Sequence, residues 1–444
     1  MSDPDSPNAG TSPLDEAHDL FLAGDTPGAM RLALALLDAG PYPLGAATLL
    51  VDLLLEVDRP IVAGEVGKSC VEGFIRRGDL PSAVASALQS ARAGEKLGPL
   101  MATIAEAFGH GSTRLGDVSP APPPLPREVT VSPTLKALDG DALHARVEGD
   151  LQTFLGRDDP AGKSAEVPRL PLFSALKPKP LARLLSVFSV RDVPAGEKVL
   201  DQGAEGSEAC VVVRGMVEAV RDFETDAELR LAALGPGAIF GEMALVANAP
   251  RAASVVALES SRLLVVTRKD LEAQAKKQKI IGQELGRFCR GRMVANLVRH
   301  SAILGAVESD ERPDLIARFT STNFETGEKL LEQGVDAPGI FLIASGKVRV
   351  EAQDDDGEEI RVAELGPGDV VGEISLVLRR PATANVVAVH STVALLLTRE
   401  EFQTAIQDHP GLLNELYDLA TKREDETRSV VGQEALDVED VVLL

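Results

Sequence analysis

Apolar residues follow two different periodicities along the chain, and the change from one to the other divides it. Between residues 14 and 112, Ala and Leu recur every three or four positions, as in PGAMRLALALLDAG and PLGAATLLVDLLLEVD. That spacing is typical of amphipathic helices packed against one another. From about residue 168 the apolar runs are short, and Gly and Pro separate them, as around EACVVV and TVALLL. Such runs predict β-strands, so an α-helical region precedes a β-rich one.

The helical region, residues 14–112, carries a weak internal repeat at its turns. The segment GDTPGA, which begins at Gly24, returns as GDLPSA at Gly78. In both, an Asp after the Gly can cap the next helix, and the Pro suits the first helical turn. We therefore expect stacked helical hairpins that loosely resemble tetratricopeptide repeats, although the spacing departs from their usual period of about 34 residues. We interpret this region as an interaction domain.

One short basic motif in this region allows two interpretations. In FIRRGDL, Arg76 and Arg77 have the spacing of the basic pair in a kinase pseudosubstrate, with Asp79 in the acceptor position. The motif also falls at the predicted end of a helix, where basic side chains are favoured by the helix dipole. The second interpretation is the one that the sequence favours.

The segments around these domains have biased compositions. Residues 113–167 contain SPAPPPLPREVTVSP and are predicted to form a stiff, exposed linker with room for one short helix. Residues 1–13 are predicted to be a disordered lead. Residues 426–444, which end in LDVEDVVLL, are an acidic and apolar tail. This tail is either a docking peptide or a frayed end.

The β-rich part repeats itself with a constant offset. Four glycines recur at the same step along the chain, as the pairs Gly196/Gly327, Gly203/Gly334, Gly215/Gly346 and Gly241/Gly372. We call this step the repeat offset. The segment LGPGAIFGE likewise returns as LGPGDVVGE. Two copies of one domain, residues 168–300 and 301–425, therefore follow one another. Within each copy, the short strands predict a jelly-roll β-barrel, and helical patterns follow it. The fold class is thus a multidomain α+β protein.

Composition and charge narrow the possible functions. The 444 residues suggest about three domains, and the net charge of −23 disfavours binding to nucleic acid or to an anionic membrane. The three cysteines have no metal-binding spacing and no disulfide framework, which fits a reducing cytoplasm. The first residues lack the apolar core of a signal peptide, and the most apolar run is too short to span a bilayer. We expect a cytoplasmic protein without membrane insertion.

The segment FGEMALVANAPRAASV, Phe240 to Val255, combines groups that suit a sugar phosphate. Gly241 allows a close approach of the backbone to a ligand, and the turn after it can point N–H groups at an anion. Arg251 can donate two hydrogen bonds to phosphate oxygens. Glu242, when ionised, can accept a hydrogen bond from a sugar hydroxyl.

This segment closely resembles the phosphate-binding cassette of the cyclic nucleotide-binding domain family. That family includes catabolite-activator-type transcription factors and the regulatory subunits of cAMP-dependent protein kinase. The resemblance covers residues 168–425, and it implies that Glu242 binds the ribose 2′-hydroxyl and that Arg251 binds the exocyclic phosphate oxygens. The predicted site comprises Phe240, Gly241, Glu242, Met243, Ala244, Arg251, Ala252 and Ala253. The alternative is that Glu242 and Arg251 pair with each other in an empty barrel.

The residue after the arginine bears on the choice of nucleotide. Members of the family that bind cyclic GMP often have Thr or Ser there, whereas this chain has Ala252. Cyclic AMP is therefore the expected regulatory ligand, cyclic GMP is less favoured, and no other cofactor is expected. The residue that would cover the base is left open, because Phe288 could do so or could pack in the core with its aliphatic neighbours.

The second copy departs from the cassette at one position. It keeps Gly372, Glu373 and Ser375, but Ala382 stands where the first copy has Arg251. Arg380 lies just before it and could turn into the site. It could also be a solvated loop arginine, with the second barrel retained for packing or contacts. The second interpretation is favoured, because a buried phosphate without its cationic partner is costly.

These features predict a regulatory protein rather than an enzyme. The sequence offers no nucleophile–base pair, metal cluster or P-loop outside the barrels. About twenty residues follow the last predicted helices, too few for a winged helix, which disfavours a transcription factor. The layout resembles that of kinase regulatory subunits, so we expect a cyclic nucleotide receptor in signal transduction. Its protein partner would bind the helical region or the tail. The rival is a scaffold whose barrels bind no nucleotide.

Overall fold

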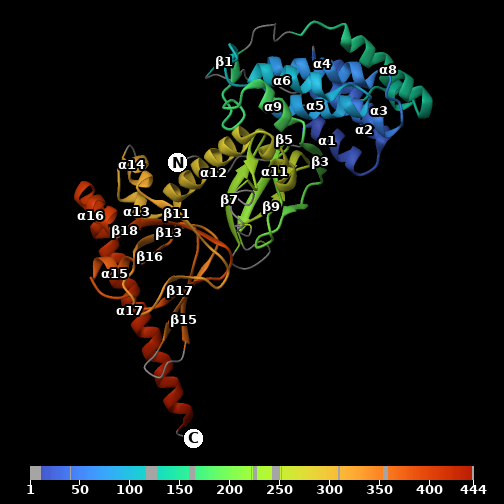
Figure 1. Ribbon diagram of the computed structural model, residues 1–444. Coiled ribbons are helices and arrows are strands. Elements are labelled where there is room, and N and C mark those ends of the chain that lie inside the picture. The colour runs from blue at the N-terminus through green and yellow to red at the C-terminus, as the bar shows by residue number, and fades with distance from the viewer. Residues whose placement is uncertain are drawn as a thin grey trace. The chain divides into compact units, whose positions relative to one another are not determined.

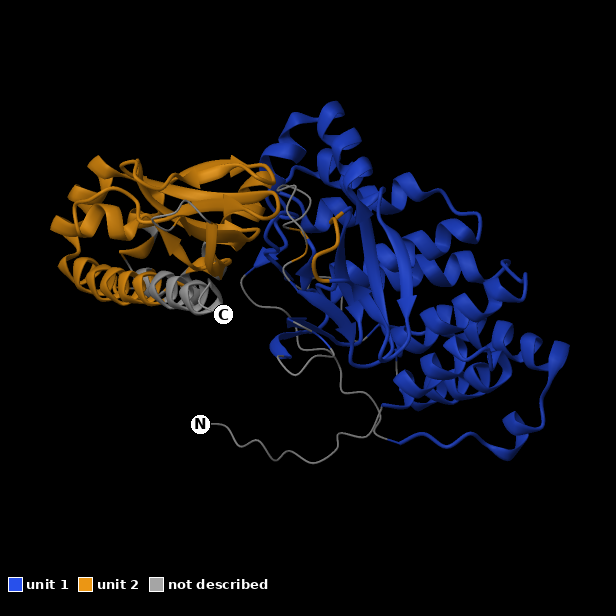
Figure 2. Ribbon diagram, turned by 90° about the horizontal axis from the view of Figure 1, so that it is seen from below, with its two compact units in different colours: residues 1–201, 207–241, 253–285 blue, residues 202–206, 242–252, 286–444 orange. Residues whose placement is uncertain are grey.

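The computed structural model describes most of the chain, and we refer to the described residues throughout. These are residues 12–40, 42–116, 128–159, 166–221, 223, 228–242, 251, 253–308, 311–353 and 359–442. They form two compact units (Figure 2). Unit 1 comprises residues 1–201, 207–241 and 253–285, and unit 2 comprises residues 202–206, 242–252 and 286–444. No helix in the described part of the chain is long and apolar enough to cross a membrane.

The helical region begins unit 1 with six helices, each packed against the next one along the chain (Figure 1). They are α1 (Pro13–Leu22), α2 (Thr26–Ala39), α3 (Leu44–Glu56), α4 (Ala63–Arg76), α5 (Leu80–Arg92) and α6 (Leu97–Phe108). The predicted caps are confirmed: Asp25 accepts a hydrogen bond from Gly28 N at 2.9 Å, and Asp79 accepts one from Ser82 N at 3.0 Å. The resemblance to tetratricopeptide repeats stays a prediction.

The segment expected to be a linker contributes to the helical core. It contains β1 (Leu115–Gly116), α7 (Pro133–Lys136), α8 (Gly140–Leu155) and β2 (Val167–Pro168). Leu143, Val147 and Leu151 of α8 recur every four positions and are buried among the side chains of the first helices. The short parallel pair β1–β2 brings the two ends of the segment together. The helix expected in this segment is present as α8. The expectation that the segment is exposed was wrong for α8, because its apolar stripe needs a covering surface. Residues 117–127, which hold most of the prolines, lie outside the described residues.

The basic pair of the FIRRGDL motif binds a carboxylate within the same region. Arg76 Nε donates to Asp159 Oδ2 at 2.7 Å, and Arg77 Nη2 donates to Asp159 Oδ1 at 2.9 Å. The Asp159 side chain is only 7% exposed. Both arginines therefore hold the chain that follows α8, and the structure favours this role over a pseudosubstrate.

The first β domain follows α9 (Pro178–Leu185) and consists of two four-stranded sheets (Figure 1). Their strand orders are β3-β10-β5-β8 and β4-β9-β6-β7. The strands are β3 (Ser189–Val193), β4 (Lys198–Leu200), β5 (Glu208–Arg214), β6 (Val217–Arg221), β7 (Leu229–Leu234), β8 (Ile239–Phe240), β9 (Ser254–Ala257) and β10 (Ser261–Thr267). Two helices come next, α11 (Arg268–Lys277) and α12 (Lys279–His300).

The second β domain repeats this order, with sheets β11-β18-β13-β16 and β12-β17-β14-β15. After α13 (Ala302–Gly305) and α14 (Arg312–Ala317) its elements are β11 (Thr320–Phe324), β12 (Lys329–Leu331), β13 (Gly339–Ser345), β14 (Val348–Gln353), β15 (Glu359–Leu365), β16 (Val370–Val371), α15 (Glu373–Val377), β17 (Asn385–Ala388), β18 (Thr392–Thr398), α16 (Arg399–Asp408) and α17 (Pro410–Val442). Equal topology supports the internal duplication. Closure of either pair of sheets into a barrel stays a prediction.

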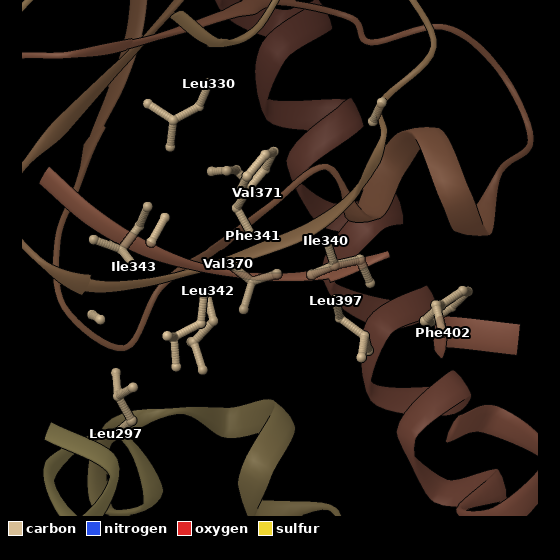
Figure 3. Close-up of a cluster of buried hydrophobic side chains, with 14 of the residues drawn as sticks. Leu297, Leu330, Ile340, Phe341, Leu342, Ile343, Val370, Val371, Leu397 and Phe402 are labelled. Atoms are coloured by element: carbon tan, nitrogen blue, oxygen red, sulfur yellow. The ribbon is translucent and has the colours of Figure 1, made fainter. Parts of the chain in front are cut away.

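The core of the second β domain also takes in the end of the preceding helix. Met293 and Leu297 of α12 are buried in the same cluster as Phe341, Val370 and Leu397. Figure 3 shows Leu297 on the side of this cluster opposite Leu330. By packing, the last turns of α12 therefore belong with the second β domain, although the sequence analysis placed the boundary after residue 300.

Candidate functional site

The cassette of each copy begins at a glycine whose backbone conformation excludes other residues. Gly241 has φ +76° and Gly372 has φ +90°. Side chains are strained in this left-handed region, whereas glycine is not. At Gly372 a Cβ would also lie 2.6 Å from the carbonyl oxygen of Gly339. These glycines are thus required by the turn itself, and α15 follows directly after Gly372 in the second copy.

The structure describes part of the predicted first cassette. Phe240 is buried on β8, where it pairs with Cys210 of β5. Ala253, just before β9, is half-buried. Three predicted site residues, Met243, Ala244 and Ala252, lie outside the described residues. Glu242 and Arg251 are the charged residues of the predicted first site that the structure describes, and Glu373 and Ala382 are their counterparts in the second cassette.

Glu242 pairs with an arginine from the helix that follows the domain. The Glu242 side chain is 6% exposed, and Arg292 Nε of α12 donates to its Oε1 at 3.1 Å. Cys289, one turn earlier on α12, lies with its Sγ 3.7 Å from the Glu242 carbonyl oxygen. Burial raises the pKa of the Cys289 thiol to about 12, and the Glu242 carboxylate contributes to that rise. The thiol therefore stays protonated and packs as an apolar group.

Arg251 is buried, and its backbone is fixed by a pair of hydrogen bonds. Its N–H donates to the Ala204 carbonyl at 3.0 Å, and its carbonyl accepts from Gly203 N at 2.9 Å. The second copy reproduces this pair at Ala382, which bonds to Val335 and Gly334, both at 2.9 Å. Only the side chain differs between the two copies at this point. The backbone hydrogen bonds at this position are therefore the same with an arginine and with an alanine.

Glu373 of the second cassette is even more enclosed than its counterpart. Its side chain is 2% exposed, and Arg423 Nη1 of α17 donates to its Oε1 at 3.1 Å. Arg423 also donates to the Val370 carbonyl and lies 3.8 Å from Asp369. Burial raises the pKa of Glu373, although Arg423 opposes that rise. Arg423 therefore occupies the polar end of the second cassette.

The other two residues predicted for the second site have local partners. Ser375 Oγ accepts a hydrogen bond from Ala337 N at 3.2 Å. Arg380 forms an ion pair with Glu424 of α17. The structure thus brings Arg423, and not Arg380, to Glu373. In the structure, Arg380 therefore does not take the place that Arg251 has in the first cassette.

A cavity of about 120 Å³ lies beside the second cassette. Glu373, Ser375 and Ala382 line it from the cassette, and Arg423 and Thr427 line it from α17. The opposite wall is apolar and comes from strands of the second β domain, with Leu331, Val350, Val362, Ala363, Leu365, Val371 and Val386. This copy therefore has a small, partly open cavity with a carboxylate acceptor, and an alanine stands at the position of Arg251.

The two helix arginines that contact the cassette glutamates were not predicted from the sequence. Arg292 and Arg423 are separated by the repeat offset, as are their partners Glu242 and Glu373. The repeat therefore continues through the helices that follow each domain, since the starts of α12 and α17, Lys279 and Pro410, are separated by the same offset. Extending the comparison beyond the strands could have found this pair. Within the described residues, no cluster of three or more metal-ligating side chains occurs.

The chain is similar to kinase regulatory subunits of several organisms. It is 28% identical over 249 residues to the cAMP-dependent protein kinase type II regulatory subunit of Drosophila melanogaster, covering 56% of this chain and 62% of that protein. It is 31% identical over 232 residues to the cAMP-dependent protein kinase regulatory subunit of Yarrowia lipolytica, covering 52% and 58%. The chain thus spans about three fifths of the length of these relatives.

Among solved structures, the regulatory domain of Toxoplasma gondii PKA, crystallised with cAMP, is 23% identical with a TM-score of 0.27. The match covers 57% of this chain and 92% of that one. The family described as the cyclic nucleotide-binding domain matches residues 190–278 and 321–409. These two segments coincide with the two β domains whose topology and cassettes are described above. Residues 190–278 and 321–409 are therefore two cyclic nucleotide-binding domains in tandem.

Proposed function

We propose that the chain is a non-catalytic receptor that binds one cyclic nucleotide, cyclic AMP, in its first domain. The observation that carries this proposal is the matched pair of loops. Arg251 and Ala382 have the same backbone hydrogen bonds, yet only the first copy has a cation for a phosphate at this position. A guanidinium suits phosphate because it can donate two parallel hydrogen bonds.

Different residues of the first cassette would bind different parts of the nucleotide. Arg251 would hold the phosphate oxygens, and Glu242 would accept a hydrogen bond from the ribose hydroxyl. Glu242 is already oriented by Arg292, so its carboxylate can accept from a second donor without losing the first. The predicted contacts of Met243, Ala244 and Ala252 belong to the same proposal.

The pairing with Arg292 supplies a route from the ligand to the second domain. Arg292 precedes Met293, which is buried in the core of the second domain together with Leu297. A ligand that changes the contact of Glu242 with Arg292 would therefore act on a helix whose far end is fixed in that core. Coupling of this kind between two sites is typically about 1–3 kcal/mol.

The output of the receptor would be a protein–protein contact. The relatives named above are regulatory subunits of a kinase, but the helical region of this chain gives no inhibitor motif that would carry the kinase role over. We place the partner on the helical region, with the tail after residue 425 as the alternative. A chain beginning near residue 165 should bind nucleotide and fail to capture the partner in a pull-down. If the shortened chain still captures the partner, the contact lies on the cyclic nucleotide-binding domains or on the tail.

Calorimetric titration of the full chain with cyclic AMP, cyclic GMP and cyclic di-GMP tests the proposed receptor. We expect cyclic AMP to bind with a stoichiometry near one per chain. A stoichiometry near two would show that the second cassette binds as well. The absence of binding for all three nucleotides would favour the rival function, a scaffold that uses both domains as interaction surfaces. The alanine at position 382 already favours such a role for the second domain.

A further inference from the structure

A cluster of buried charges joins the helical region to the first cyclic nucleotide-binding domain within unit 1. Arg262 of β10 is at its centre, with a side chain that is 9% exposed. It donates two hydrogen bonds to Asp192 of β3, at 2.7 and 2.9 Å, within the domain. Its Nη1 also lies 2.6 Å from Asp52 Oδ2 of α3, in the helical region. One guanidinium thus binds a carboxylate from each side.

One further ion pair and a buried histidine extend this cluster along α1. Arg214, at the end of β5, donates to Asp15 at 2.7 Å. His18, one turn after Asp15, is 4% exposed. Helix α5 packs against β3 and β5 beside these residues, as can be followed in Figure 1. We call Asp15, His18, Asp52, Asp192, Arg214 and Arg262 the interface cluster.

The second domain shows what the same sheet looks like without this contact. The three domain residues of the cluster sit on neighbouring strands, where Arg262 is paired with both Asp192 and Arg214. Their counterparts at the repeat offset have the same strand register, since Val393 is paired with both Asn323 and Ser345. All three charges are therefore replaced by uncharged residues in a domain of the same topology. The charges are thus not required by the fold of the sheet.

We infer that the interface cluster is a recognition surface that directs the helical region to the first domain and excludes it from the second. The partner of this surface is the chain's own helical region, through the carboxylates of Asp15 and Asp52. Docking on the second domain would bury both carboxylates against Asn323, Ser345 and Val393, none of which is a cation. Specificity of this kind depends on the cost of docking on the second domain as much as on the favourable contacts with the first domain.

Buried ion pairs support such a role better than a purely stabilising one. Removing two charges from water is costly, so an ion pair of this kind often adds little net stability, whereas an unpaired buried charge is strongly unfavourable. Arg262 forms contacts with both sides at once, which fixes the position of α3 relative to the sheet. The helical region and the first domain therefore behave as one body, and the helical region is not a freely tethered module.

Transplanting the residues of the second domain into the first tests this inference. The full chain carrying Asp192→Asn, Arg214→Ser and Arg262→Val has a set of residues that the second domain already accommodates. We expect the helical region to be released, so the radius of gyration from small-angle X-ray scattering increases. Hydrogen exchange should also rise in β3, which is an edge strand of its sheet, and stay slow in β5 and β10, which have a strand on each side.

The matched control is Arg191→Met, which removes another two-pronged ion pair from the same sheet. Arg191 donates to both carboxylate oxygens of Glu208, at 2.9 and 2.7 Å, within the domain alone. This variant should leave scattering and exchange unchanged. If the triple variant does not fold, Asp15→Asn with Asp52→Asn removes the charges from the helical side and should release the region as well. A helical region that stays docked in a folded triple variant, or in the Asp15/Asp52 variant, would overturn the inference.

Discussion

The two cyclic nucleotide-binding domains share their topology and differ in two sets of side chains. Strand order is the same in both, and the loop at Arg251 has the same backbone hydrogen bonds as the loop at Ala382. One difference is therefore Arg251, the arginine that we propose binds phosphate. The other is the charged cluster around Arg262, because Val393 stands at that position in the second copy. Both sets of charged side chains are absent from the matching positions of the second copy.

A third feature is common to both domains and limits how the difference can be interpreted. Each cassette glutamate is buried and paired with an arginine of the following helix, Glu242 with Arg292 and Glu373 with Arg423. The second copy therefore keeps the link between cassette and helix although Ala382 stands in place of Arg251. The difference that we propose to be functional is the arginine itself.

The largest effect is expected from Arg251→Ala. This change makes the first cassette like the second and leaves the phosphate in a buried site without its cation. Removing one member of a buried charge pair costs about 2–5 kcal/mol, which is roughly 30- to 3,000-fold in affinity. Calorimetry of the full chain should then detect no binding of cyclic AMP at concentrations that saturate the wild type.

Arg380→Ala is the control for that measurement. Arg380 is bound to Glu424 of α17, so its loss should leave nucleotide affinity unchanged. Binding that survives Arg251→Ala and is lost with Arg380→Ala would show that the second cassette is the working site.

The reverse change, Ala382→Arg, should make the second cassette like the first. The backbone at Ala382 is already held as at Arg251, and Ala382 lines the cavity beside Glu373. We expect the stoichiometry of cyclic AMP to rise from near one towards two, with a weaker second site because the Glu373 side chain, 2% exposed, is more enclosed than that of Glu242, which is 6% exposed. Thr383→Arg, one position off register, is the matched control and should leave the stoichiometry near one. If Ala382→Arg also leaves it there, Arg423 and α17 close the second site whichever residue stands at 382.

Much of this architecture was predictable, because both the duplication and the cassettes are local patterns. Gly241 and Gly372 mark turns that only glycine adopts readily, and Asp25 and Asp79 each cap the helix that follows directly. These features depend on near neighbours in the sequence. The apolar stripe of α8 is equally local, but the proline-rich composition before it favoured a linker prediction for the whole segment.

The long-range charge pairs were not predictable from spacing along the chain. Arg262 and Asp52 belong to different domains, and the sequence around either residue contains no pattern that predicts this pair. The internal repeat nevertheless contains a usable signal, since Arg262 becomes Val393 and Asp192 becomes Asn323 in the second copy. A charge present in only one of two matched domains indicates a contact that only that domain makes. Arg292 and Arg423 give the opposite signal, because a shared charge indicates a shared role.

Acidification should weaken the docking of the helical region on the first domain. Burial lowers the pKa of His18 well below its usual value, and Arg214 and Arg262 lower it further. Docking therefore favours the neutral imidazole. It is unaffected above the ordinary pKa of about 6.5 and weakens as the pH falls below it, because only the undocked state then binds the proton. The radius of gyration of the full chain should increase between about pH 7.5 and about pH 5.5.

Other charged groups around His18 set the controls for this pH dependence. They are Asp15, Asp19, Asp52, Asp192, Arg214, Glu259 and Arg262. Burial and the Asp15 carboxylate raise the pKa of Glu259, so its protonation relieves repulsion as the pH falls and acts against His18. His18→Gln should abolish the expansion, and Glu259→Gln should enhance it. An expansion that persists in His18→Gln would assign the effect to the carboxylates.

The smallest effect is expected from Ala252→Thr, which concerns the choice between nucleotides. Ala252 follows Arg251 and offers no hydroxyl to the amino group of a guanine, so the wild type should prefer cyclic AMP over cyclic GMP. A threonine can supply one hydrogen bond, and a net contribution of about 0.5–1.5 kcal/mol is roughly 2- to 12-fold in affinity. Competition binding should therefore show the preference narrowing by that factor, with the affinity for cyclic AMP nearly unchanged. Ala252→Val, which has the same shape without the hydroxyl, should leave the preference as it is. Equal affinities for both nucleotides in the wild type would show that the residue after the arginine does not set the selectivity of this cassette.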